Sequence, residues 1–292
     1  MIPKEILRNI RRIQITTSRM VTDVFAGQYQ SVFKGRGMEF DEVREYQPGD
    51  EIRSIDWNVT ARMGNPYVKK FVEERELTVM LIVDASMSCQ FGSLKQLKSQ
   101  LAAELCSVLA FSAIQNNDKV GLIIFTDRIE KFVPPRKGLR HVLRIIREAL
   151  YFKPQGQGTD IVLALEYLNR VTKRKAISFL ISDFFAPDFK RFLSIANQRH
   201  DIVAVTITDP REMDLPNVGI VKLNDPETAA EFIIDTGDAN FRKKYHQDAL
   251  NRIKDRRTLL RSVNVDSIDL RTDLPYTKEL IKFFRSRERK YA

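Results

Sequence analysis

The sequence predicts an α/β fold in which helices flank a mostly parallel sheet. Residues 77–84 (LTVMLIVD) and 119–127 (KVGLIIFTD) are almost continuously apolar, a pattern typical of parallel strands that are covered on both faces. Between them, residues 93–117 carry leucines near helical spacing, which predicts a helix. Strands that alternate with helices of this length indicate a parallel sheet joined by helical crossovers.

The same alternation continues to the end of the chain. Apolar runs predict further strands over residues 175–185, 201–209 and 265–273. A short edge strand is predicted after residue 127, ending at two prolines because proline cannot donate a backbone hydrogen bond. Helical spacing predicts helices over residues 139–152, 161–174 and 187–200, over a long basic segment, and at the C-terminus.

Composition limits the class of protein. The chain has 292 residues, of which 43% are hydrophobic and 29% are charged, enough to bury a core in one or two domains. No apolar run approaches the roughly 18 residues that span a bilayer, and the start of the chain lacks the apolar segment of a secretory signal. Two cysteines are too few for a disulfide framework. We therefore expect a cytoplasmic protein, with peripheral attachment to the inner face of the membrane as an alternative.

The first 76 residues differ in pattern and predict a separate module made of a helix and a small, irregular β element. Ile6, Ile10 and Ile13 have helical spacing, with lysine and arginine nearby. This pattern fits a helix that packs on the body of the protein or, alternatively, one that lies on a membrane surface. Residues 35–76 are dense in turns, with β-favouring pieces between them. We place the second domain at residues 77–292.

The net charge of +10 is concentrated near the C-terminus. Residues 241–292 hold fifteen Lys and Arg against seven Asp and Glu, so this segment carries eight of the ten net positive charges. Such a segment could attract anionic lipid, nucleic acid or an acidic protein. The basic residues are not interleaved with aromatic ones, which makes nucleic acid the least expected of the three.

Oxygen-bearing side chains follow the predicted strands at the edge where ligands bind in open α/β sheets. Asp84, Ser86 and Ser88 come at alternate positions after the first strand, so an extended segment turns all three to one side. Asp183 follows a later strand, and Thr159 lies in a glycine-bearing loop just before a helix. Hard oxygen ligands of this kind suit Mg²⁺. Asp, Ser and Thr are also common helix caps, and capping is the alternative interpretation.

The segments VDASMS, GQGTD and FLISDF, in this order, resemble the metal-ion-dependent adhesion site (MIDAS) of the von Willebrand factor A-type fold. The resemblance covers residues 77–292 and implies that Rossmann-like fold. It implies a site for Mg²⁺ or Mn²⁺ whose ligands are Asp84, Ser86, Ser88, Thr159 and Asp183. Two carboxylates leave much of the metal charge uncompensated, so we expect a carboxylate of a partner protein as the last ligand.

Residues 35–76 (GRGMEFDEVREYQPGDEIRSIDWNVTARMGNPYVKKFVEERE) closely resemble the signature of the bacterial domain-of-unknown-function family fifty-eight. In that family the block directly precedes an A-type domain. The resemblance implies a MoxR-type AAA+ ATPase as a partner, and a chaperone-like role in the assembly or maturation of other complexes.

We therefore expect a metal-dependent protein–protein interaction module that acts as an adaptor or chaperone-like partner of a MoxR-type ATPase, and not an enzyme. One alternative is a surface-associating protein that uses its basic C-terminal segment on an anionic membrane or nucleic acid. Another is a metal-dependent phosphate-ester enzyme, but the second carboxylate of the D-x-D pattern is missing after Asp84. The sequence also has no P-loop and no metal-spaced histidine pair.

Overall fold

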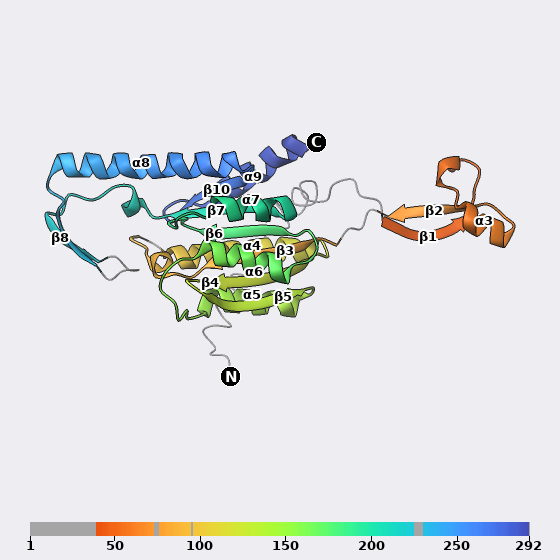
Figure 1. The fold of residues 1–292 in the computed structure, drawn as a ribbon, viewed down its shortest axis with the longest axis horizontal. Helices are drawn as coiled ribbons and strands as arrows, with labels where there is room; N and C mark the ends of the chain where they lie inside the picture. The colour runs from red at the N-terminus through yellow and green to blue at the C-terminus, as the bar shows by residue number, and fades with distance from the viewer. Residues whose placement is uncertain (1–38, 73–75, 95, 225–229, 292) are drawn as a thin grey trace.

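A six-stranded sheet forms the centre of the protein. The computed structural model describes residues 39–72, 76–94, 96–224 and 230–291. The strands of this sheet are β3 (Thr78–Asp84), β4 (Lys119–Phe125), β5 (Ile129–Arg136), β6 (Ile177–Ser182), β7 (Asp201–Thr208) and β10 (Asp266–Arg271). Their order is β10-β7-β6-β3-β4-β5, and all neighbours are parallel except β4 and β5. The predicted α/β fold with a mostly parallel sheet is confirmed (Figure 1).

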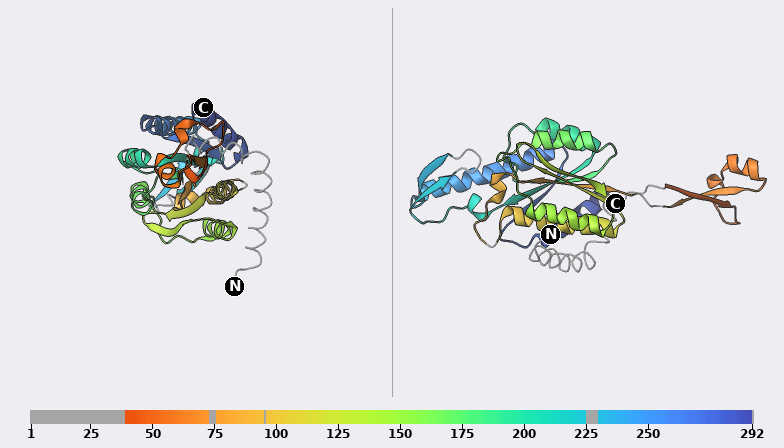
Figure 2. Two further views of the ribbon diagram at one scale, coloured as in Figure 1. Left: turned by 90° about the vertical axis from the view of Figure 1, so that its right-hand side faces the viewer. Right: turned by 90° about the horizontal axis from the view of Figure 1, so that it is seen from below.

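Helices cover both faces of the sheet (Figure 2). One face packs with α4 (Lys98–Gln115), α5 (Leu139–Tyr151) and α9 (Tyr276–Tyr291), and the other with α6 (Ile161–Val171), α7 (Lys190–Arg199) and α8 (Ala239–Ser262). Successive side chains of a strand point to opposite faces, so Leu81 of β3 joins the first layer and Ile82 the second. Within the described part of the chain, no helix combines the length and the apolarity needed to cross a bilayer.

β5 differs from its prediction at the two prolines. The sequence predicts that the strand ends there, but β5 continues through Pro134 and Pro135 to Arg136. β5 is an edge strand, and its register with β4 is irregular between Val120 and Leu122. Proline is tolerated at such a place because its missing N–H is not needed at a sheet edge or at a bulge.

α4 begins later than its pattern predicts. Helical spacing starts near Ser93, but the helix begins at Lys98, after a short 3₁₀-helix η3 (Met87–Gln90). The backbone N of Ser93 donates to Asp209 at 2.9 Å, and its hydroxyl donates to the same carboxylate. A contact between residues 116 positions apart therefore overrides the local periodicity.

Two pairs of antiparallel strands lie outside the central sheet. β1 (Glu39–Glu45) pairs with β2 (Tyr67–Val72), and η2 (Ile52–Ser54) and α3 (Trp57–Met63) lie between them. β8 (Ile220–Asn224) pairs with β9 (Glu231–Asp235), in the segment between η4 (Pro210–Glu212) and α8. Figure 1 shows β1, β2 and α3 grouped apart from the central sheet.

Charged side chains of the N-terminal module stabilise its own turns. Arg44 donates to both carboxylate oxygens of Asp50, at 2.7 and 2.8 Å. Asp56 caps α3 by accepting from the backbone N of Asn58 and of Val59. The expected small β element is present, whereas the helix expected at residues 6–13 lies outside the described residues.

His200, at the end of α7, is a buried imidazole. It is 1% exposed, and its Nδ1 accepts from the backbone N of Ala176 at 3.3 Å. Its Nε2 has no hydrogen-bond partner among the described residues. Burial, with a smaller contribution from the positive charge of Arg199, lowers the pKa of His200 from 6.5 to about 4.

Acidification is expected to weaken the fold through His200. Because the folded-state pKa lies below the unfolded one, the unfolded chain takes up the proton first, and the free energy of unfolding falls between about pH 6.5 and pH 4. The loss attributable to His200 is on the order of 2 kcal/mol. Urea denaturation at pH 7 and pH 5 should show that the free energy of unfolding changes less with pH for His200→Gln than for the native chain. An equal change in the two proteins would contradict this prediction.

Candidate metal centre

The switch point of the sheet lies between β3 and β6. These two strands are neighbours, and the helices that follow them, α4 and α7, pack on opposite faces. A crevice forms at the carboxyl ends of two such strands, and ligands bind there in open α/β sheets. Asp84 ends β3 and Asp183 follows β6, so both carboxylates lie at this crevice.

Asp84 is a buried carboxylate, 2% exposed, that is held by two donors. The hydroxyl of Ser182 donates to Oδ2 at 2.6 Å, and the backbone N of Ser86 donates to Oδ1 at 2.9 Å. Burial raises the pKa of Asp84 to about 6, and the negative charge of Asp183 adds to this rise. A carboxylate perturbed in this way is stabilised by a nearby cation.

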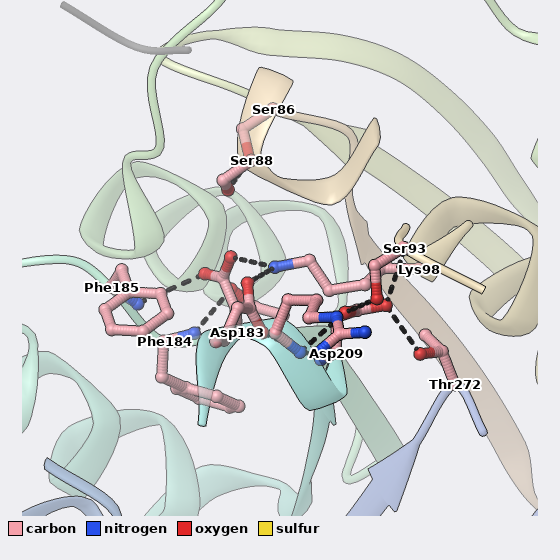
Figure 3. A network of polar contacts seen from close by, with 12 residues as sticks. Ser86, Ser88, Ser93, Lys98, Asp183, Phe184, Phe185, Asp209 and Thr272 are labelled. Carbon is pink, nitrogen blue, oxygen red and sulfur yellow. Dashed lines mark hydrogen bonds and ion pairs between the residues drawn. The ribbon is translucent and has the colours of Figure 1, made fainter. Parts of the chain in front are cut away.

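Ser86 and Ser88 turn their hydroxyls toward one another where η3 begins. Their Oγ atoms are 3.0 Å apart. This is close to the separation of about 2.9 Å between adjacent ligands of an octahedral ion whose metal–oxygen bonds are about 2.0–2.1 Å. Figure 3 shows Ser86 and Ser88 beside each other at the turn where η3 begins. The structure therefore brings Asp84, Ser86 and Ser88 together, and the negative charge of Asp183 acts on Asp84 from the neighbouring strand.

The loop that carries Thr159, the fifth expected ligand, is attached to the serine turn. The backbone N of Met87 donates to the carbonyl oxygen of Gln157 at 3.0 Å, which joins the two segments. Thr159 itself is half-buried. The cap of α6 is the next residue, because Asp160 Oδ1 accepts from the backbone N of Leu163 at 2.9 Å. The capping interpretation is therefore wrong for Thr159.

Glu130 of β5 fixes the same loop. Its Oε1 accepts from the backbone N of Gln155 at 2.9 Å and of Gly156 at 2.6 Å, and from the hydroxyl of Thr126 at 2.9 Å. The loop passes so close to Thr126 that a β-carbon added at Gly156 would lie 2.2 Å from its Oγ1. Glycine is needed at this position because the backbone approaches its neighbours so closely.

Lys98, the first residue of α4, belongs to the centre although its sequence pattern does not reveal it. Its Nζ donates to Asp183 Oδ2 at 2.9 Å and to Glu212 Oε1 at 2.6 Å. Figure 3 shows the ammonium group reaching the Asp183 carboxylate. The lysine side chain is 1% exposed. Lysine is almost never fully buried unless it is paired, and a single lysine in a helical pattern gives no signal of such pairing.

The turn after Asp183 orients its carboxylate. The backbone N of Phe185 donates to Asp183 Oδ1 at 3.2 Å. Phe184 has a positive φ of 60°, which is uncommon for a residue with a large side chain, and it is buried against Phe189. Phe185 is 47% exposed, with the guanidinium of Arg252 over its ring. An exposed aromatic ring therefore lies at the rim of the centre.

The chemistry of the donors fits a hard divalent cation. The expected ligands are two carboxylates and three hydroxyls, and Mg²⁺ and Mn²⁺ prefer such oxygen ligands. Among the described residues, no group of three or more His, Cys, Asp and Glu side chains is placed to hold a metal. Hydroxyl oxygens would therefore have to form part of any metal site at this edge.

Many basic residues near the C-terminus are paired with carboxylates of the same domain. Arg256 and Arg257 bind Asp269, and the 4% exposed side chain of Arg287 binds Asp201 and Asp266. Except for Asp201, these residues line a cleft of about 660 Å³ between α8, β10 and α9. The basic runs of the sequence are thus partly neutralised within the fold and are not wholly solvated helix faces.

Replacing Asp84 by Asn is expected to stabilise the protein when divalent ions are removed. The raised pKa means that the charged form costs stability, a cost that is absent below about pH 4 and complete above about pH 6. Asn removes the charge at similar shape, so the free energy of unfolding in EDTA at pH 7.5 should increase by about 1–2 kcal/mol. Urea denaturation measures this, with the exposed Asp214→Asn as the control. A destabilised Asp84→Asn variant would contradict the expectation.

Gly156→Ala is expected to displace the loop that carries Thr159. The added β-carbon would lie 1.9 Å from Asp127 Oδ1, so the loop has to move. We expect a loss of about 1–3 kcal/mol in the free energy of unfolding, together with weaker Mg²⁺ binding in calorimetry. Gly158→Ala is the matched control, because its nearest contact is an ordinary 3.8 Å to the Asp127 β-carbon. Equal effects of the two substitutions would argue against a fixed loop.

Curated relatives and solved structures resemble this chain over most of its length. An uncharacterized protein of Mycobacterium tuberculosis is 31% identical over 285 residues, which cover 96% of this chain and 89% of the relative. The uncharacterized protein YeaD of Bacillus subtilis is 23% identical over 181 residues, 62% of this chain and 43% of YeaD.

The central fold also occurs in a solved structure. A protein of Bacteroides fragilis, described as an aerotolerance-related membrane protein, superposes with a TM-score of 0.50 at 15% identity and covers 73% of this chain and 99% of that chain. At this identity the likeness concerns the fold alone. The family described as "Protein of unknown function DUF58" matches residues 42–255. This chain therefore belongs to the DUF58 family.

Proposed function

We propose that this protein is a metal-dependent protein-interaction module, in which a partner's carboxylate completes the coordination of Mg²⁺ or Mn²⁺. The observation that carries the proposal is the meeting of Asp84, Asp183 and the paired Ser86 and Ser88 hydroxyls at the switch point of the sheet. Thr159 is the remaining protein ligand. This is the ligand set of a MIDAS, and we assign residues 77–292 to the von Willebrand factor A type.

The contacts of the expected metal ligands indicate the role of each residue. Asp84 is oriented by Ser182, and Asp183 by the turn at Phe185, so both carboxylates are fixed before a metal arrives. Ser86 and Ser88 are neutral ligands. Because Asp183 is shared with the ammonium of Lys98, the two ligand carboxylates would neutralise a bound divalent ion only in part, which favours an anionic group of another protein.

The rim of the centre has the apolar character of an interaction surface. Met87 lies between the two ligand serines and is 39% exposed, and Phe185 is 47% exposed. Methionine and aromatic residues are enriched at protein interfaces. A partner that offers an acidic side chain surrounded by apolar ones would complement this arrangement.

We assign a binding role rather than catalysis. Asp84 and Asp183 are assigned to the metal and Glu212 is engaged by Lys98, so each carboxylate of the centre already has a role other than proton transfer. We extend the proposal to a MoxR-type AAA+ ATPase as partner, which the family resemblance of residues 35–76 implies, with this protein as adaptor or chaperone-like factor in the assembly or maturation of other proteins. We place this activity in the cytoplasm.

The proposal predicts that Asp84→Ala abolishes both metal binding and metal-dependent partner binding. Isothermal titration with Mg²⁺ and Mn²⁺ should give saturable heat for the native chain and none for Asp84→Ala. Capture of the purified cognate MoxR-type ATPase should require Mg²⁺, be lost in EDTA, and be lost in the variant. Asp214→Ala, whose side chain is 69% exposed, should behave as native. Undiminished, EDTA-resistant capture by Asp84→Ala would refute a metal-dependent contact.

A second function is favoured by a basic stripe on α9. Lys278, Lys282, Arg285 and Arg289 are exposed and share one face of the helix, because they are spaced by three or four residues. Such a stripe could associate with an anionic membrane surface and, less readily, with nucleic acid. That association would fall with added salt and would be the same in Asp84→Ala, which separates it from the metal-dependent function.

A further inference from the structure

Lys98 lies at a position that is unfavourable for a lysine unless its ammonium pairs with a neighbouring negative charge. It lies in the first turn of α4, where the helix dipole disfavours a positive side chain. Its side chain is almost completely buried, and an unpaired buried ammonium would be costly. A cation at this position stabilises neither the helix N-terminus nor the apolar core. The presence of a lysine is therefore explained by the two carboxylates that its ammonium contacts.

The ammonium of Lys98 is shared between a ligand and a non-ligand carboxylate. Asp183 accepts at 2.9 Å and is one of the expected metal ligands, whereas Glu212 accepts at 2.6 Å and is not. Glu212 is itself fixed, because its Oε2 accepts from the backbone N of Asp209 at 2.8 Å. Lys98 therefore retains Glu212 as a partner when Asp183 binds a divalent ion.

We propose that Lys98 is a built-in counter-cation that competes with the divalent ion for Asp183 and thereby sets the metal affinity of the centre. This inference rests on the proposed function in one respect, namely that Asp183 is a metal ligand. Without a divalent ion, Lys98 neutralises Asp183 and stabilises the buried edge. When the ion binds, Lys98 repels it and is retained by Glu212.

The charged state of Lys98 agrees with this role. Burial alone would lower its pKa, but the negative charges of Asp183 and Glu212 outweigh burial and hold the pKa above the usual value for lysine. Lys98 is therefore protonated at physiological pH in the metal-free centre. An ammonium and a divalent ion that share one carboxylate repel each other even at the dielectric constant of water.

The test compares the metal affinity of the native chain with that of two substitutions at Lys98. Lys98→Met removes the charge at similar length, and Lys98→Arg keeps it. In titration calorimetry with Mg²⁺ and with Mn²⁺, Lys98→Met should bind about tenfold more tightly than the native chain, because the repulsion is removed. Lys98→Arg should stay close to the native affinity. In EDTA, Lys98→Met should have a lower Tm than the native chain, and saturating Mg²⁺ should restore most of the difference.

Each outcome separates the role of Lys98 from the proposed function. If Lys98→Met is folded and binds Mg²⁺ with native affinity, the competition is refuted while the metal-dependent function stands. If the native chain binds no metal and Lys98→Met does, the competition is supported and the metal-dependent function is overturned. Folded chains that all fail to bind overturn both. Should Lys98→Met fail to fold even with Mg²⁺, Lys98→Gln, which is neutral but polar, replaces it under the same criteria.

Discussion

The burial of two carboxylates at one edge of the sheet is the constraint on which the rest of this region depends. Asp84 and Asp183 lie at the ends of neighbouring strands, and a buried charge is costly unless donors or cations compensate it. Ser182, the backbone N of Ser86 and the ammonium of Lys98 each supply part of that compensation. Glu212 is a third carboxylate at this edge, and it accepts from the same ammonium.

Hydrogen-bond acceptors hold the loops around this edge in place. Glu130 fixes the loop before Thr159, and Asp209 ties the segment at Ser93 to Thr272 at the end of β10. Burial would raise the pKa of Asp209, but hydrogen bonds from Ser93, the backbone N of Arg211 and Thr272 hold it below its usual value. Asp209 therefore remains a charged acceptor, and the loops that present the ligand oxygens are positioned before any ligand binds.

The central domain and the N-terminal module contribute different surfaces. The central domain offers a charged centre with an apolar rim, whereas the N-terminal module exposes Trp57 and Ile52, each 67% accessible, on elements that its own charged residues stabilise. Exposed apolar groups on both the central domain and the N-terminal module are consistent with a protein that binds other proteins. The basic stripe on α9 is a third surface, and it differs from the first two because its attraction is electrostatic and therefore screened by salt.

The sequence by itself determined the α/β class, the order of the strands of the central sheet and of the helices between them, and the candidate ligands, because apolar runs and strand-end polar residues are local patterns. Only the tertiary structure decided that α4 starts at Lys98 and that Lys98 pairs with Asp183. The reason is physical. Burial and ion pairing join residues 85 positions apart in the chain, and local periodicity carries no information about which distant charge a side chain will meet.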